Sequence, residues 1–259
     1  MIRPDNYNHL KTLGVDFVKP KKAKSGQNGP DFGFRYQNKV IWIEAVVPAP
    51  IDIPIEHLLP PEKKFKVGSE PHKEKLLRWT AVIKDKKDKI TKYIEQGLIA
   101  KEDSVVIAVN SCRLQDWAFD DNGISQFPYA VEATLAVGPR MFQISKSDGK
   151  IVGPPQNAGR YSVRKEDRED ISTDVFFKVE YKCISAVIGT HQRDLWKRPL
   201  WLSLVHNPLA TNPLPQKHFA ATREYVCDLN YVSGMEEYRM VSSFKLQKIR
   251  VGLVDVNTG

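Results

Sequence analysis

The 259-residue sequence lacks the features that mark several large classes of protein. Its three cysteines, Cys112, Cys183 and Cys227, lie far apart and form no Cys-x-x-Cys pair. We therefore expect free thiols in a reducing compartment, with neither a zinc site nor a disulfide framework, and a cytoplasmic location. No apolar run approaches the roughly 20 residues of a membrane-spanning helix, and the N-terminus does not follow the pattern of a signal peptide.

Positive charge is unevenly distributed along the chain. The net charge is +8, and residues 1–101 carry 20 Lys and Arg against 12 Asp and Glu, whereas residues 102–259 carry 19 of each. The whole excess therefore lies in the first part of the chain. Such a basic region suits a polyanion such as nucleic acid, although a solvated basic surface would have the same composition.

Residues 29–48 have the pattern of a β-hairpin. Phe32, Phe34 and Tyr36 alternate with smaller or polar residues, residues 37–39 form a polar turn, and residues 40–47 are a second, mostly apolar run. A run of this kind is typical of a central strand that is buried on both faces.

Two acidic residues interrupt this apolar hairpin. Asp31 stands at the start of the first predicted strand, and Glu44 lies inside the second between Ile43 and Ala45. A buried carboxylate is costly unless a cation or hydrogen-bond donors compensate it. Two carboxylates on one hairpin favour a Mg²⁺ site, and a structural ion pair of Glu44 with Arg78 or a lysine is the main alternative.

The remaining pattern predicts a mixed α/β protein of the α+β type. Helices are expected over residues 4–13 and 71–97, and strands over residues 15–18, 104–110, 129–137, 141–144, 175–188 (one or two strands), 200–205, 225–229, 239–244 and 247–254. The first 110 residues thus have the order helix, strand, strand, strand, helix, strand. We expect residues 1–112 to form the core and residues 113–259 a β-rich extension packed on the same globular unit.

The order of elements, together with Pro30-Asp31 and Glu44 separated from Asp31 by 12 residues, resembles the restriction-endonuclease-like PD-(D/E)XK nuclease superfamily. The resemblance covers about residues 5–110 and implies an αβββαβ core and Mg²⁺-dependent hydrolysis of DNA. It also implies that Asp31, Glu44 and the backbone carbonyl of Ala45 hold Mg²⁺ or Mn²⁺. The chain is similar as well to a group of uncharacterised bacterial proteins, through runs such as WIEAVVPAP and HNPLA.

The sequence departs from that superfamily at one position. Val46 stands where the pattern has the lysine that orients the attacking water and offsets charge. The following helix offers Arg78, Lys86 and Lys87 as replacements. Of these we favour Arg78, because the stems of Lys86 and Lys87 are expected to pack along the helix with their heads turned to solvent.

The resemblance and the basic residues together predict contacts with a nucleic acid, DNA rather than RNA. The expected phosphate-binding residues are Lys19, Lys21, Lys22, Lys24, Lys84 and Lys89. Two alternatives stay open: a catalytically inactive nucleic-acid-binding protein on the same fold, which Val46 favours, and an interaction protein without a nucleic-acid role. The oligomeric state is also open, a homodimer included. His72 and His191 are expected on the surface, and His206 and Asn207 in a structural loop.

Overall fold

The computed structural model describes residues 16–20, 29–58, 71–114, 121–165, 169–191, 202–217, 221, 223–231 and 241–249. The expected helix over residues 4–13 and the strand end at residue 254 lie outside the described residues. Within the described part, the protein is a mixed α/β protein with one large mixed sheet and few helices, compatible with the predicted α+β class.

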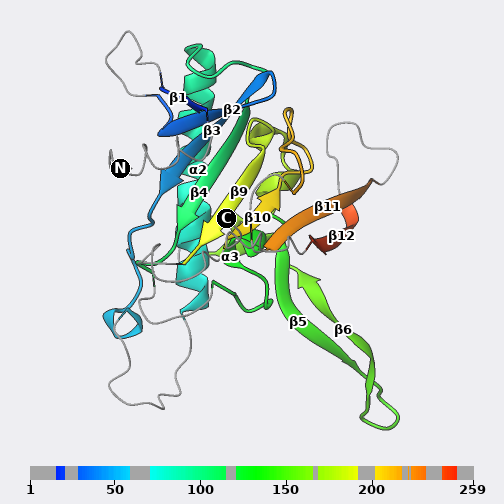
Figure 1. Ribbon diagram of the computed structural model, residues 1–259. Helices are drawn as coiled ribbons and strands as arrows, with labels where there is room; N and C mark the ends of the chain where they lie inside the picture. Colours follow the sequence, from blue (N-terminus) through cyan, green and yellow to red (C-terminus); the bar gives the residue numbers. More distant parts are fainter. Residues whose placement is uncertain are drawn as a thin grey trace, which may run out of the picture.

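The large sheet has eight strands in the order β1-β2-β3-β4-β9-β10-β11-β12 (Figure 1). These are β1 (Phe17–Val18), β2 (Phe32–Tyr36), β3 (Lys39–Val46), β4 (Ser104–Asn110), β9 (Ala186–Thr190), β10 (Ser203–His206), β11 (Arg223–Tyr231) and β12 (Val241–Ile249). The β2–β3 hairpin is antiparallel, β3, β4 and β9 are mutually parallel, and β10 pairs parallel with β11. Strands from both halves of the sequence therefore belong to one sheet.

The long helix α2 (His72–Glu95) connects the parallel strands β3 and β4 across one face of the sheet (Figure 1). Helical spacing brings Leu76, Ile83 and Ile90 onto one stripe, and each of these side chains is completely buried. The helix ends before Gly97, whose φ of +68° is the left-handed conformation that favours glycine at a helix terminus. Helix α2 was predicted within two residues at its C-terminal end.

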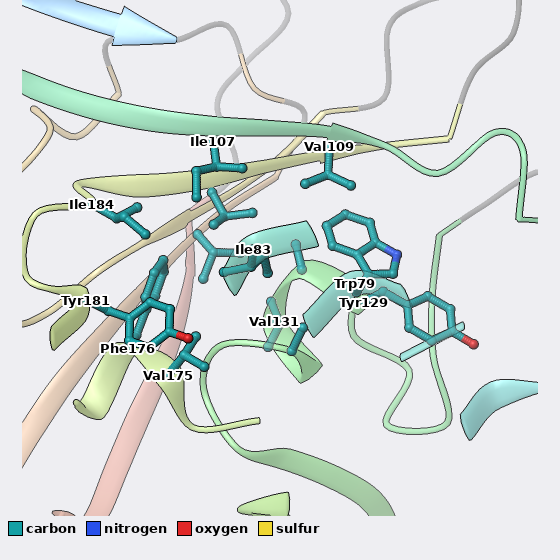
Figure 2. Close-up of a cluster of buried hydrophobic side chains, with 14 of the residues drawn as sticks. Trp79, Ile83, Ile107, Val109, Tyr129, Val131, Val175, Phe176, Tyr181 and Ile184 are labelled. Carbon is teal, nitrogen blue, oxygen red and sulfur yellow. The ribbon is translucent and has the colours of Figure 1, made fainter. Parts of the chain in front are cut away.

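The larger hydrophobic core lies between the sheet and its helices. Figure 2 shows Trp79 and Ile83 of α2 facing Ile107 and Val109 of β4, while Phe176 and its neighbours close the opposite side of the cluster. A smaller cluster that includes Ile41, Ile43, Val106 and Leu204 covers the other face of the sheet. Central strands are thus buried on both faces, which explains their unbroken apolar runs.

Two strand predictions in the second half of the chain are wrong. Residues 129–137 begin with the short helix α3 (Tyr129–Glu132), which follows Pro128. Residues 175–188 begin with the 3-10 turns η2 (Val175–Phe177) and η3 (Val179–Tyr181) before β9 starts. Short apolar runs do not distinguish a buried strand from a buried helical turn, because neither one has a solvent-facing side to set a period. Within residues 241–249, the two strands expected over residues 239–244 and 247–254 are one continuous strand, β12, and their outer ends lie outside the described residues.

The remaining elements are small. They are η1 (Ile55–His57), the strand pair β7 (Ser162–Arg164) and β8 (Asp170–Ser172), and the strand pair β5 (Val137–Ile144) and β6 (Ile151–Gly159). The β5–β6 pair extends away from the large sheet as a two-stranded ribbon (Figure 1). None of the helices in the described ranges is both long enough and apolar enough to cross a membrane.

Candidate functional site around Glu44 and Lys86

The β2–β3 hairpin brings Asp31 and Glu44 together, as predicted from the sequence. Phe32 pairs with Ile43, so extending the register by one residue sets Asp31 opposite Glu44. Directly opposed residues of an antiparallel pair share one face of the sheet. The Asp31 carboxylate also accepts a hydrogen bond from the Ala45 backbone N–H through Oδ2 at 2.7 Å. Both acids therefore belong to the end of the hairpin where β3 finishes.

Alternation along β3 directs Glu44 toward α2. Trp42 and Val46 belong to or pack against the core beneath the helix, whereas Ile41 and Ile43 belong to the cluster on the opposite face. Glu44 lies on the Trp42 and Val46 side, and only 3% of its surface is exposed. This burial explains why a carboxylate inside the apolar run needs a compensating cation.

Lys86 supplies that cation. Its Nζ donates a hydrogen bond of 2.6 Å to Oε1 of Glu44, and its side chain is 12% exposed. Oε2 of Glu44 is buried and accepts no hydrogen bond within the described part of the chain. Among the described residues, Glu44 is therefore half satisfied: one oxygen is paired to an ammonium group and the other has no hydrogen-bond partner.

The other two predicted cations of α2 do not reach Glu44. Arg78 is half-buried and forms no ion pair with Glu44. Lys87 pairs with Asp88, with 2.7 Å between Nζ and Oδ1, and its ammonium lies 5.6 Å from the centre of the Tyr181 ring. The preference for Arg78 and the solvent-facing role given to Lys86 are thus wrong, because Lys86 points inward to the carboxylate.

Tyr93 is a member of the site that the sequence analysis missed. It lies two helical turns after Lys86 and is 5% exposed. Burial raises the pKa of Tyr93, and the negative charges of Glu44 and Asp31 raise it further, so the phenol stays protonated at neutral pH near both acids. Trp79, Lys86 and Tyr93 are spaced by seven residues, and this spacing is the signal that could have marked Tyr93 as inward-facing and Lys86 as a candidate beside Lys87.

The expected phosphate-binding lysines have mixed outcomes. Lys19, Lys84 and Lys89 are exposed, the last two on α2. Lys21, Lys22 and Lys24 fall in residues 21–28, outside the described ranges. Ala45, whose carbonyl was expected to be a third metal ligand, is exposed next to Glu44. Across the described residues, no group of three or more His, Cys, Asp or Glu side chains is arranged to hold a metal ion.

Three histidines take part in polar clusters away from this site. His72 lies near the buried Glu132 together with Arg160, and His191 contacts Ser111, whose hydroxyl donates to Asp121. His72 and His191 were expected on the surface, but both are partly buried and take part in polar contacts. His206 pairs with the buried Glu224.

Asn207 has the predicted structural role in the loop that follows β10. Its amide nitrogen donates to the backbone carbonyls of Tyr181 and Ile184, at 3.0 and 2.8 Å. These two bonds hold the loop against the segment that precedes β9.

Comparison of the chain with models of known protein families, with curated proteins and with solved structures finds no match.

Proposed function

We propose that the protein is a metal-dependent nuclease that hydrolyses phosphodiester bonds in DNA, with a variant of the PD-(D/E)XK site. The observation that carries the proposal is the contact between Lys86 and the buried Glu44, beside Asp31. A carboxylate pair with an adjacent lysine has the chemical parts that phosphodiester hydrolysis requires. In this variant, the lysine comes from α2 because the strand position two residues after Glu44 is Val46.

The two carboxylates fit a divalent cation. Oε2 of Glu44 is buried without a hydrogen-bond partner in the described structure, and a buried anionic oxygen of this kind is stabilised by a cation. Asp31 is exposed beside it and uses only Oδ2 to hold the Ala45 N–H. Carboxylate oxygens are the ligands that Mg²⁺ and Mn²⁺ prefer. When bound, the ion would lower the pKa of a coordinated water and offset charge on the phosphate.

The side chains of the protein would divide the remaining work. Asp31 and Glu44, with the Ala45 carbonyl, would hold the ion at the end of β3. The Lys86 ammonium would neutralise charge that develops on the phosphate, the role that the missing strand lysine has in the superfamily. The Lys86 side chain is largely buried, which holds its ammonium in place, so little reorganisation is needed during the reaction. The exposed Lys84 and Lys89 would contact neighbouring phosphates.

The order of elements also supports an αβββαβ core. Strands β1, β2 and β3, helix α2 and strand β4 follow one another as the resemblance implies, with β3 and β4 parallel and adjacent. The first helix of that core would fall in residues 4–13, outside the described ranges.

The second candidate is a nucleic-acid-binding protein that has lost catalysis. The observations that favour it are Val46 and the direct Glu44–Lys86 ion pair, which by itself neutralises the buried acid. This candidate predicts salt-dependent DNA binding that needs no metal and is unchanged by Glu44→Gln.

Cleavage of supercoiled plasmid DNA tests the proposal. Wild-type protein is expected to nick the plasmid in Mg²⁺ or Mn²⁺ and not in EDTA. Asp31→Ala and Glu44→Gln should each lower the rate by at least about 10³-fold, since each removes a ligand of the ion. The matched control is Asp52→Ala, which changes an exposed aspartate in the loop after β3. Equal rates for wild type and Asp31→Ala would refute the proposal.

Thermal unfolding gives a readout of metal binding that does not depend on activity. Mg²⁺ at about 100 times its dissociation constant should stabilise wild-type protein by about 2.7 kcal/mol, because the ion binds the folded state alone. The shift in Tm should vanish in Asp31→Ala and persist in Asp52→Ala. An equal Mg²⁺-induced shift in all three proteins would show that the ion binds elsewhere.

A further inference from the structure

The ribbon formed by β5 and β6 has an unusual surface. Its side chains Met141, Phe142, Ile144, Ile151 and Val152 are each at least 50% exposed, and they are five of the eleven exposed large hydrophobic residues in the described structure. Figure 1 shows the ribbon extending away from the sheet and helices. We call residues 139–157 of this ribbon the arm.

Packing within the described part of the chain does not explain the exposure of the arm. Consecutive residues 140–144 are all exposed, so both faces of the ribbon are in contact with solvent. An isolated two-stranded ribbon contributes little stability of its own, and a concentrated exposed apolar surface marks a binding site. Such a surface is typical of an element that contacts a partner.

The base of the arm is fixed rigidly to the body. Arg160, just after β6, donates to the buried Glu132 of α3 at 2.7 Å, and its Nη1 lies 2.8 Å from Nε2 of His72 at the start of α2. The Asn157 amide donates to the carbonyls of Ser125 and Gly138 at 3.0 Å each. These bonds hold the arm in one direction relative to α2, the helix that carries Lys86.

The charge of the arm indicates the class of partner. It carries Arg140, Lys146 and Lys150 against the single acid Asp148, a net charge of +2. Two copies of such an arm would repel each other, whereas a polyanion would attract both. Positive charge near the base of the ribbon, at Arg140, and in the turn at its tip, at Lys146 and Lys150, suits the phosphates that border a groove of DNA.

We propose that the arm inserts into the major groove of double-stranded DNA. This inference deepens the proposed function and rests on it, because it names duplex DNA as the substrate class. The major groove of B-form DNA is wide enough for a two-stranded β-ribbon, whereas that of A-form RNA is too narrow. Phe142, Ile144 and Ile151 would contact thymine methyl groups, and the basic residues would bind phosphates.

Fluorescence anisotropy with a labelled DNA duplex of about 20 base pairs, measured in EDTA, tests the arm apart from catalysis. Lys146→Glu/Lys150→Glu should weaken binding at least about tenfold and lower the salt slope by about two. Phe142→Ser/Ile151→Ser should weaken binding about tenfold with an unchanged slope. Two double variants outside the arm are the matched controls. Lys101→Glu/Lys182→Glu changes two exposed lysines that precede β4 and β9, and Ile55→Ser/Val179→Ser changes two exposed apolar side chains.

The outcomes separate this inference from the proposed function. Loss of binding in both arm variants but in neither control supports the arm, even if wild-type protein fails to cut DNA and the nuclease proposal falls. Wild-type affinity in the arm variants overturns the arm while leaving the nuclease proposal standing. An equal effect on duplex RNA overturns the groove assignment. Light scattering could instead show that Phe142→Ser/Ile151→Ser converts a dimer to a monomer while the DNA affinity is unchanged. That result would also overturn the groove assignment, because the partner of the arm would then be a second copy of the chain.

Discussion

Lys86→Met should slow metal-dependent DNA cleavage by about 10² to 10⁴-fold, the range that a positioned catalytic side chain contributes. The methionine keeps the apolar stem that packs along α2 and removes only the ammonium group that contacts Oε1 of Glu44 at 2.6 Å. Metal binding should survive, because the ligands Asp31 and Glu44 are unchanged. Cleavage rates at saturating Mg²⁺ measure the effect.

Lys87→Met is the matched control for this change. Lys87 is adjacent on the same helix, but its ammonium pairs with Asp88 and lies over Tyr181. We expect a cleavage rate within about threefold of wild type, because the Lys87 ammonium pairs with Asp88 and not with Glu44. If both variants lose activity equally, the effect is one of overall charge and not of Lys86.

Folding of the Lys86→Met protein must be measured separately. Removal of one partner leaves the buried Glu44 charge without compensation, which costs about 3–5 kcal/mol in known buried pairs. The double variant Glu44→Gln/Lys86→Met removes both charges and should recover much of that loss. Chemical denaturation of the single and double variants gives the coupling between the two residues, independently of cleavage.

Glu132→Gln should lower the free energy of unfolding by about 3–5 kcal/mol, the second large effect expected. Glu132 is completely buried, and its carboxylate accepts from Arg160 at 2.7 Å and from the Ser125 N–H at 2.7 Å, with His72 3.1 Å away. The amide cannot neutralise Arg160, so a cation remains near the base of the arm without its anion. Urea denaturation measures the loss, with the exposed Glu95→Gln as control.

The decrease in the free energy of unfolding caused by Glu132→Gln should depend on pH. Burial alone would raise the pKa of Glu132, but hydrogen bonds from His72 and Ser125, and the charge of His72, hold the pKa below its usual range. A lowered folded-state pKa contributes stability that is present above the unfolded pKa of about 4.3 and disappears as the pH falls through the folded-state pKa. The difference from wild type should therefore be full at pH 7 and shrink in acid. A difference that grows on acidification would contradict the account.

The hairpin and its two acids could be predicted from the sequence because their signal is local. Alternation in β2, the polar turn and the long apolar run of β3 fix the register, and Glu44 stands out as a charge in an apolar run. Helix α2 was predictable for the same reason. A sequence shows directly the period at which apolar and polar residues alternate, and that period defines a hairpin or an amphipathic helix.

Spacing along α2 placed Lys86 in line with Trp79 and Tyr93 and Lys87 in line with Ile83 and Ile90, so it left both lysines as candidates. Lys87 lies between Ile83 and Ile90 in the period that the sequence suggested, yet Lys86 meets Glu44. Which lysine reaches β3 depends on how the helix is rotated and tilted over the sheet, and that is set by packing of Trp79 and Ile83 against β4 (Figure 2). The short helix α3 was missed because Tyr129 to Val131 are buried on all sides and leave no polar period to detect.

The most direct test of the central claim is to move the lysine back to the strand. Val46 lies on the α2 side of β3, two residues after Glu44, so a lysine there would share the face of Glu44. In the plasmid assay with Mg²⁺, Val46→Lys added to Lys86→Met should restore cleavage at least about tenfold over Lys86→Met alone, whereas Val46→Leu should not. Wild-type protein that leaves the plasmid intact, or a Lys86→Met protein that cuts as fast as wild type, would contradict a site built from Asp31, Glu44 and a helix lysine.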